Sequence, residues 1–548
     1  MAETKLYIFK CAPLFACLLF LFSPQTYAQE WVYTVIKGDT LSEFSQKHLY
    51  KTSYWKQLQK INNVIDPKRI PENTKLRVPI AWIKSQPASA TIIKITGSAH
   101  IYRQGTPRST PAAIDNTLNL GDQLETGEQS NVLIRFADNS EIVVMQNAKV
   151  DFNHMTQYGE TGMVDSRIRL IQGDIETHAK TQKGNAARFE IHTPAAISAV
   201  RGTRFRTSYS TTDSSSHIEV LEGGVAVKGG RTTRLVRSGY GTHIEKNKAP
   251  LKPQKLLPAP EILTYPEPIE VIGSQVRWKP IKKAINYRVL ISTSQQFGSI
   301  VWDSNSDRTA ISLPDLADAT YFFELRAIDK FGIEGIPTHQ SFTLNAHPQP
   351  PFLAAPNDQA IIRGEPPTLE WTRSSEADKY RLEISLSKSF QTTVIDRNTL
   401  TETNYRASEL SPSNTYYWRV ASIAKDGEQG PYSPIRMITM KPIPAVPQPA
   451  LEESESDVKL TWLEGLANET FQIQIARDRQ FDSIISDTNS TKPELTLPRP
   501  EGYRYIRVRT LADDGFAGAW GVTQELSPPP NESWIYIYGS FLMTVLLL

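Results

Sequence analysis

The chain has 548 residues, with 60 Lys and Arg against 58 Asp and Glu and a formal net charge of +2. A domain usually takes about 100 to 200 residues, so several hydrophobic cores are expected. Basic residues are spread along the chain, which argues against nucleic acid as a partner because phosphate binding needs a concentrated basic face. The 37 prolines and 7 methionines favour strands, turns and linkers over a helical bundle.

The first 28 residues are typical of a secretory signal peptide. Lys5 and Lys10 precede an apolar run over 11–22, so we expect residues 1–28 to be removed by cleavage after Ala28. A retained anchor helix and a lipoprotein signal at Cys17 are disfavoured alternatives, because the apolar run is short yet continues past Cys17. Both cysteines of the chain lie in this segment, so the mature protein would have no disulfide and no cysteine nucleophile.

Residues 31–82 have the pattern of a strand, two short helices and a strand. An extended segment at 33–36 precedes a turn, and Thr40 or Asp39 can cap the first helix. The second helix begins near 52–53, and the closing strand lies at 76–79. The first helix runs through Leu41, Phe44 and His48, and the second carries Trp55, Leu58 and Ile61 on one face at helical spacing.

This segment resembles the LysM family. The residues that carry the resemblance are Tyr33-Thr34-Val35, Gly38-Asp39-Thr40-Leu41-Ser42, Asn62, Asp66-Pro67, Ile70-Pro71 and Leu76-Arg77-Val78-Pro79. The resemblance implies a small α+β domain of βααβ order. It also implies binding of glycans that contain N-acetylglucosamine, hence peptidoglycan, in a shallow groove between the loop after the first strand and the loop before the last.

The predicted glycan-binding residues form two walls, where short polar groups can hydrogen-bond N-acetyl and hydroxyl groups and small apolar surfaces can meet the sugar faces. They are Gly38, Asp39, Thr40 and Leu41 in the first wall and Ile70, Pro71, Glu72 and Asn73 in the second. The family commonly has Pro-Gly-Gln where this chain has Pro-Glu-Asn at 71–73, which alters the second wall. Two structural alternatives stay open: Asp39-Thr40 as a helix cap and Asn62 as a side-chain bridge.

Residues 91–246 show short alternating strands and predict an all-β domain. A hairpin is expected around the turn at 138–140, where Asn139 can adopt positive φ. The apolar residues that alternate on its two strands are Val132, Ile134, Phe136, Ile142 and Val144.

This region resembles the periplasmic domain of the FecR family. The matching residues are Gly121-Asp122-Gln123-Leu124-Glu125-Thr126-Gly127, Ser130, Phe136-Ala137-Asp138-Asn139-Ser140, Arg169-Leu170, Gly173-Asp174-Ile175, Phe189-Glu190-Ile191-His192-Thr193-Pro194-Ala195 and Val200-Arg201-Gly202-Thr203-Arg204-Phe205. Members of the family pass an outer-membrane signal to a sigma factor through a cytoplasmic segment and a membrane helix. A predicted signal peptide and the LysM-like segment occupy that end here, so the resemblance implies periplasmic sensing or docking.

Arg201 within this region could clamp an anion. We favour a structural role for it, in which it pairs with an acidic neighbour while Gly202 allows a tight bend.

Beyond a Lys- and Pro-rich linker at 247–260, the chain repeats itself about every 90 residues, which predicts three tandem β-sandwiches at 261–346, 352–442 and 449–527. The repeated positions are Trp278, Trp371 and Trp462; Tyr287, Tyr380 and Phe471; Phe297, Phe390 and Phe481; Asp303, Asp396 and Asp487; and Gly332, Gly427 and Gly515. The repeats look like fibronectin type III or immunoglobulin-like modules. We expect their aromatic side chains to form cores, not a sugar-stacking ladder.

The C-terminal segment 531–548 is dominated by an apolar run over 534–548. Its 15 residues fall short of the roughly 20 that span a bilayer as a helix. Two interpretations stay open: a membrane-seated tail with Trp534, Tyr536 and Tyr538 at the interface, or a buried terminal strand or helix.

The sequence carries no recognisable catalytic motif. It has no His-x-His or His-Glu-x-x-His pair, no Gly-x-Ser-x-Gly elbow and no Gly-x-x-x-x-Gly-Lys loop. We therefore predict a protein without enzymatic activity, cofactor or metal.

The fold class expected from all of this is multidomain and mainly β, and the location expected is the periplasm or cell envelope. The leading function is an envelope protein that binds peptidoglycan and engages protein partners of unknown identity. The first alternative is a sensor coupled to an outer-membrane receptor or sigma-factor pathway. The second is a peptidoglycan hydrolase, because a glycosidase needs only two carboxylates.

Overall fold

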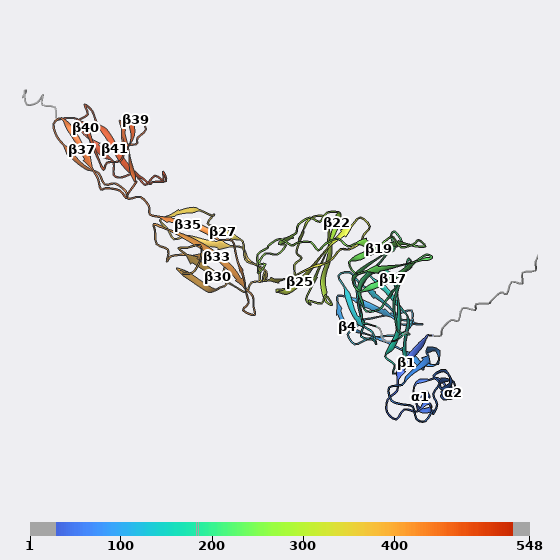
Figure 1. Ribbon diagram of the computed structural model, residues 1–548. Coiled ribbons are helices and arrows are strands. Elements are labelled where there is room, and N and C mark those ends of the chain that lie inside the picture. Colours follow the sequence, from blue (N-terminus) through green and yellow to red (C-terminus); the bar gives the residue numbers. More distant parts are fainter. Residues whose placement is uncertain (1–28, 182–183, 185, 530–548) are drawn as a thin grey trace, which may run out of the picture. The chain divides into compact units, whose positions relative to one another are not determined.

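The computed structural model describes residues 29–181, 184 and 186–529. The predicted signal peptide (1–28) and hydrophobic tail (531–548) lie outside the described residues. The described part of the chain is mainly β (Figure 1). It divides into two compact units between Asn345 and Ala346. The longest described helix has eight residues, and none of the described helices reaches the length and apolarity of a membrane span.

The N-terminal module has the predicted βααβ order (Figure 1, blue). Its elements are β1 Glu30–Thr34, α1 Leu41–His48, the 3-10 turn η1 Thr52–Tyr54, α2 Trp55–Ile61, β2 Lys75–Pro79 and the 3-10 turn η2 Ile80–Trp82. Strands β1 and β2 pair antiparallel, with Tyr33 opposite Leu76. The Thr40 hydroxyl caps α1 by accepting from the Glu43 N–H at 3.2 Å, as expected.

Leu41, Phe44, His48 and Leu58 are buried. Of the other two residues on the face of Leu58, Trp55 is half-buried and Ile61 is 39% exposed. It is the last residue of the seven-residue helix α2, and the chain turns directly after it, with Asn63 at φ 51°.

The next domain is all-β, as predicted. Its strands are β3 Ser85–Pro87, β4 Ala90–Thr96, β5 Ala99–Tyr102, β6 Ser109–Pro111, β7 Thr117–Leu118, β8 Gln123–Thr126, β9 Asn131–Arg135, β10 Glu141–Val144, β11 Lys149–Tyr158, β12 Met163–Ala179, β13 Arg188–His192, β14 Ile197–Val200, β15 Thr203–Ser210, β16 Ser215–Glu222, β17 Gly224–Gly229, β18 Thr232–Arg237, β19 Tyr240–Glu245 and β20 Gln254–Lys255. They pair into a closed arrangement around one large apolar core.

The predicted hairpin in this domain is confirmed. Strands β9 and β10 pair with Ile134 opposite Ile142 and Val132 opposite Val144, all fully buried. Asn139 in the turn adopts φ 63°.

Strand β12 is 17 residues long and belongs to two sheets. Its first part pairs with β11 and β13, and from Gly173 onward it pairs with β10 and β15. Gly173 adopts φ 87°, and a Cβ there would lie 2.6 Å from the Ala148 Cβ, so only glycine fits where the strand changes sheets. Near the start of β12, Met163 packs into the core of the N-terminal module together with Ala186.

The remaining strands form three successive two-sheet sandwiches, the first in unit 1 and the others in unit 2 (Figure 1). The first sandwich comprises β21 Gln275–Arg277, β22 Ala284–Ser292, β23 Ile300–Ser306, β24 Ala310–Ser312, β25 Ala319–Asp329 and β26 Thr338–Leu344. The second comprises β27 Leu353–Ala355, β28 Ala360–Arg363, β29 Thr368–Trp371, β30 Lys379–Ser385, β31 Ile395–Leu400, β32 Asn404–Arg406, β33 Asn414–Ile423, β34 Gln429–Tyr432 and β35 Arg436–Lys441. The third comprises β36 Ala450–Glu453, β37 Asp457–Thr461, β38 Thr470–Ala476, β39 Ile484–Ser490, β40 Glu494–Pro498, β41 Arg504–Leu511 and β42 Gln524–Leu526.

The repeated aromatic residues are core residues, as predicted. The rings of each Trp and the following Tyr or Phe meet edge to face, with centroids 5.3, 5.7 and 5.4 Å apart in the three sandwiches. The Trp278, Trp371 and Trp462 side chains are all buried.

The first sandwich packs one sheet face against the outer face of the preceding β-domain. The apolar side of this contact consists of Met145, Val143, Leu290, Phe297, Ile300 and Phe322. Between the two domains the chain runs along the surface, where β20 pairs with β19 and Leu256 is buried.

Candidate functional site

The two loops predicted to form glycan-binding walls are joined by backbone hydrogen bonds. The Val35 N–H donates to the Thr74 carbonyl, and the Asn73 N–H donates to the Val35 carbonyl, both at 2.9 Å. The Leu41 N–H donates to the Pro67 carbonyl at 2.9 Å. The structure therefore places residues 36–41 beside residues 66–74.

Asp39 holds the first loop in shape. One carboxylate oxygen accepts from the Tyr33 hydroxyl at 2.7 Å and from the Ile36 N–H at 2.9 Å. Burial and the Asp39 carboxylate together raise the pKa of Tyr33 to about 12. Gly38 is exposed at the tip of the loop with φ 97°, a conformation that favours glycine.

The second loop closes without the glycine typical of the LysM family. The Thr74 N–H donates to the Pro71 carbonyl at 3.2 Å, and Asn73 takes the left-handed position of this turn at φ 68°. Pro71, Glu72 and Asn73 are exposed. Asn73 thus supplies the backbone conformation, and Glu72 is free to present its carboxylate.

Two of the predicted wall residues are buried. Leu41 is 0% exposed and Ile70 is 8% exposed, so both side chains belong to the core of the module. Only their backbone groups can therefore contact a glycan. Their side chains contribute by fixing the two loops.

Two exposed apolar residues in these loops escaped the sequence analysis. Ile36 is 61% exposed and Ile65 is 98% exposed. Ile36 lies in the first loop, and Ile65 lies directly before the second. Isoleucine is usually buried, so residue type alone gives no signal for the exposure of these two side chains. Their positions next to the polar turns are the only signal in the sequence.

Asn62 has the structural role that the sequence left open. Its side chain donates to the Leu58 carbonyl at 3.0 Å and to the Arg77 carbonyl at 2.9 Å, and it accepts from the Arg77 N–H at 2.6 Å. It therefore fastens the end of α2 to β2.

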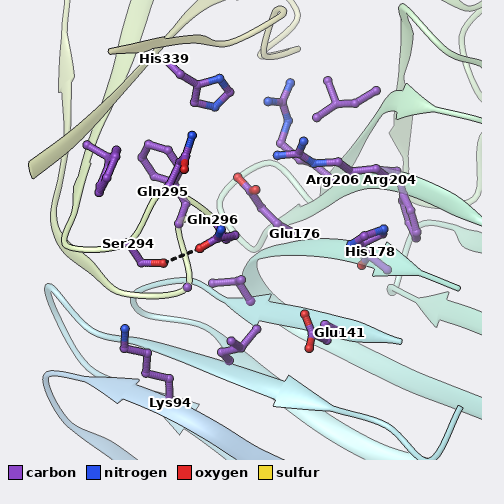
Figure 2. Close-up of a pocket in the computed structure, with 18 of the residues that line it drawn as sticks. Lys94, Glu141, Glu176, His178, Arg204, Arg206, Ser294, Gln295, Gln296 and His339 are labelled. Atoms are coloured by element: carbon purple, nitrogen blue, oxygen red, sulfur yellow. Dashed lines mark hydrogen bonds between the residues drawn. The ribbon is translucent and has the colours of Figure 1, made fainter. Parts of the chain in front are cut away.

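A second candidate site is a cleft of about 860 Å³ between the all-β domain and the first sandwich (Figure 2). Figure 2 shows Lys94, Glu141, His178 and Arg204 on the sheet of the all-β domain. The opposing loop 294–296 carries a serine and two glutamines. The cleft thus presents both charges and side-chain amide groups, which suits a polar extended ligand such as a peptide segment.

The contact beside this cleft contains a network of buried charges. Arg288 donates to Asp303 at 2.7 and 2.9 Å, to Asp174 at 2.9 Å and to Glu334 at 2.9 Å. Burial alone would lower the pKa of Arg288, but the three carboxylates raise it.

A second arginine extends the network. Arg326 pairs with Glu176 and Glu324, and with Glu334 at 2.7 Å. Glu176 comes from the all-β domain and the others from the sandwich, so the arginine joins the two domains. Burial would raise the pKa of Glu324, but the Arg326 charge outweighs it and holds the value at about 2.

On the all-β side of the network, Arg206 donates to the carbonyls of Glu334 and Gly335 at 2.9 and 2.7 Å. Glu219 lies 3.7 Å from Arg206, and burial raises the pKa of its carboxyl to about 8. Within the described residues, no group of three or more His, Cys, Asp or Glu side chains is arranged to hold a metal ion.

Arg201 is exposed and donates to the Gly184 carbonyl at 3.3 Å. The predicted pairing with an acidic neighbour is not found among the described residues. Gly202 adopts φ 72° and makes the expected bend.

Three family models match separate parts of the chain. The LysM domain model matches residues 33–79, and the FecR protein model matches residues 122–226. The model of the Rha78A-like, N-terminal immunoglobulin domain matches residues 356–442. The predicted LysM, FecR and immunoglobulin-like modules are confirmed. Domains of these three families are binding or signalling modules, and LysM and FecR domains are typical of the bacterial envelope or periplasm.

Similar solved structures include two kinds. One is a candidate anti-sigma factor from Parabacteroides distasonis, 11% identical over 24% of this chain and 59% of that chain, with a TM-score of 0.21. The chain thus spans less than two thirds of that protein. The others are fibronectin type III segments of chicken CNTN1 (16% identity, 50% of this chain, 98% of that chain, TM-score 0.22) and chicken tenascin (12%, 32%, 98%, 0.23). No curated protein sequence matches significantly.

Proposed function

We propose that this protein is a non-catalytic component of the bacterial cell envelope, exported to the periplasm, which holds peptidoglycan through its LysM module. The observation that carries the proposal is the joined loop pair, because backbone hydrogen bonds fix both loops while leaving polar and apolar groups exposed. The FecR-like domain and the sandwiches then face protein partners.

The exposed groups suit an N-acetylated sugar chain. The backbone of Gly38 and the side chains of Glu72 and Asn73 offer hydrogen bonds, and Ile36 and Ile65 offer apolar surface for a sugar face. Asp39 and Thr40 contribute mainly by holding the first loop, through one Asp39 carboxylate oxygen and the Thr40 hydroxyl.

Sedimentation with insoluble peptidoglycan tests this proposal. The double variant Ile36→Ser with Ile65→Ser should lower the bound fraction roughly tenfold, because it removes exposed apolar surface without touching the core. A matched control is Ile114→Ser with Val271→Ser, which changes two exposed apolar residues elsewhere. Equal sedimentation of both double variants would overturn the assignment of the loops.

A chain that starts near residue 90 should not sediment, whereas the full mature chain should. If both sediment equally, the LysM module is not the anchor. Incubation with purified sacculi tests the absence of catalysis, and release of muropeptides would show a hydrolase instead.

The FecR match favours a second function, in which the protein senses or couples to an outer-membrane receptor. The cleft of Figure 2 is where a peptide segment of such a partner would bind. A photo-crosslinking residue in place of Gln295 should then capture an outer-membrane receptor in intact cells. If no receptor is captured, only the first proposed function, peptidoglycan binding by a non-catalytic envelope protein, remains.

A further inference from the structure

The three sandwiches have an equivalent sheet face, and this face carries a different set of charged and neutral side chains in each sandwich. The register set by the repeated Trp and Gly residues makes five positions on this face equivalent. They are Arg288, Arg381 and Gln472; Leu290, Glu383 and Gln474; Asp303, Asp396 and Asp487; Glu324, Arg419 and Arg507; and Arg326, Ala421 and Arg509. On β22, β25, β30, β33, β38 and β41 the neighbouring residues are mostly buried in the core, so the side chains at four of these positions lie on the opposite face, and the aspartates of β23, β31 and β39 contact them there.

In the first sandwich this face is occupied. Its arginines Arg288 and Arg326 receive carboxylates from another domain, namely Asp174 and Glu176 of β12. The first repeat therefore shows what this face binds: acidic side chains on a protein sheet.

In the second sandwich the face neutralises itself. Arg381 pairs with Asp396 at 2.7 Å and with Glu383 at 3.3 Å, and Arg419 pairs with Glu383 at 2.7 Å. Each arginine on this face has an acidic partner in its own sandwich.

In the third sandwich neutral amides stand in place of those partners. Arg507 donates to the Gln474 side-chain oxygen at 2.7 and 2.9 Å, and Arg509 donates to that of Gln472 at 2.7 Å. Asp487 is bound by the amide groups of both glutamines at 2.7 Å. In the part of the chain that the structure describes, neither arginine forms an ion pair.

Stacked rings hold the two arginines in place. The Arg507 guanidinium lies 4.0 Å from the Phe481 ring centroid and 4.3 Å from that of Trp520, and Arg509 lies 4.4 Å from Trp520. Burial and the charge of Arg509 lower the pKa of Arg507, and the charge of Asp487 offsets this only in part. A fixed pair of guanidiniums with unused donors matches carboxylate geometry and loses little side-chain entropy on binding.

We propose that Arg507 and Arg509 form a docking site for the acidic side chains of a protein partner. We expect weaker binding at the second sandwich, where Glu383 and Asp396 already occupy donors of Arg381 and Arg419. The proposal deepens the partner-facing role assigned to the sandwiches and does not depend on glycan binding.

Fluorescence anisotropy with the full mature chain tests it. The probe is an alternating Glu-Thr hexapeptide with a neutral fluorophore, and the matched probe has Gln in place of each Glu. The acidic probe should bind, and its affinity should fall several-fold when salt is raised from 50 to 300 mM. Absence of binding by the acidic probe, or equal binding of the two probes, would overturn the proposal.

Gln474→Glu is the most informative variant, because it installs the carboxylate that Glu383 supplies in the second sandwich. It should weaken probe binding about tenfold without lowering the thermal midpoint. Arg507→Gln with Arg509→Gln should abolish binding, whereas Arg381→Gln with Arg419→Gln should leave it unchanged. Unchanged binding by the Gln474→Glu variant would sink the proposal even if the arginine variants fail to fold.

Polygalacturonate provides the competing arm. If it binds through Arg507 and Arg509 while the acidic peptide does not, the ligand is an anionic glycan and the proposed protein partner is wrong. Peptidoglycan sedimentation of the same variants should stay at the wild-type level, which separates failure here from failure of the LysM assignment.

Discussion

Two contacts between neighbouring domains use charge in opposite ways. Between the FecR-like domain and the first sandwich, Arg326 is 2% exposed and lies among several carboxylates. Between the second and third sandwiches, Lys441 pairs with Asp513 at 2.7 Å, and the two side chains are 25% and 53% exposed. A buried charge must keep its partners, whereas an exposed pair can exchange them for water. The first contact therefore commits the two domains to each other.

The largest expected effect comes from Arg326→Ala, which leaves Glu176, Glu324 and Glu334 without this cation. Breaking a buried ion pair by removing one partner costs about 3 to 5 kcal/mol. Urea unfolding of the full chain, followed by tryptophan fluorescence, should show the transition of unit 1 at lower urea. A loss below about 1 kcal/mol would mean that the contact opens easily and that the comparison fails.

A smaller effect is expected from Asn131→Ala. The buried Asn131 side chain of β9 donates to the Ile300 carbonyl at 2.5 Å and accepts from the Ile300 N–H at 3.4 Å. Its removal takes away both of these hydrogen bonds inside the contact, at a cost of about 1 to 3 kcal/mol. The same urea experiment measures it, with the exposed Gln296→Ala as the control that should leave the midpoint unchanged.

The buried contact should also give a pH dependence. Burial raises the pKa of Glu219 to about 8, so the folded protein holds this proton where the unfolded chain releases it. The free energy of unfolding should therefore fall between pH 6.5 and 8 by at most about 1.4 kcal/mol per pH unit. Burial lowers the pKa of His217, and that effect is confined to pH values below its ordinary 6.5.

Urea midpoints at half-unit steps from pH 6.5 to 8.5 measure this slope. In the Glu219→Gln variant the slope should be reduced by at least half. A wild-type midpoint that rises over this range would contradict the assigned direction.

The smallest effect is expected from Asp513→Asn at the exposed contact. The Asp513 side chain is 53% exposed and that of its partner Lys441 is 25% exposed, so the unfolding midpoint of unit 2 should stay within experimental error. A midpoint shift as large as that of Arg326→Ala would show that the two contacts are alike after all.

Local patterns in the sequence predicted the modules well. Alternation over Val132, Ile134, Ile142 and Val144 fixed the hairpin faces, because side-chain period and burial are linked within one strand pair. The repeated tryptophans identified the sandwich cores for the same reason. The exposure of Ile61 could not be predicted, because helical spacing says nothing about where a short helix stops.

The sequence could not reveal contacts between modules. Arg288 and Arg326 stand at the solvent-facing positions of alternating strands, and only the docking of a second sheet buries them. In the candidate glycan site, the polar turn residues were predictable from the family resemblance. The burial of Leu41 and Ile70 depends on the meeting of chain segments about 30 residues apart. The hydrogen bonds of Asp39 depend on a turn geometry that residue spacing does not specify.

Strand β12 touches the LysM module near its start at Met163 and the first sandwich near its end at Asp174 and Glu176. At about 3.3 Å per residue, its 17 residues span roughly 55 Å without a break in the chain. If the LysM module holds peptidoglycan as proposed, tension between it and the first sandwich would run along this strand and load its flanking hydrogen bonds in shear, all at once. Such a strand resists pulling far better than a hairpin that unzips bond by bond, so β12 can serve as the mechanical tie of unit 1.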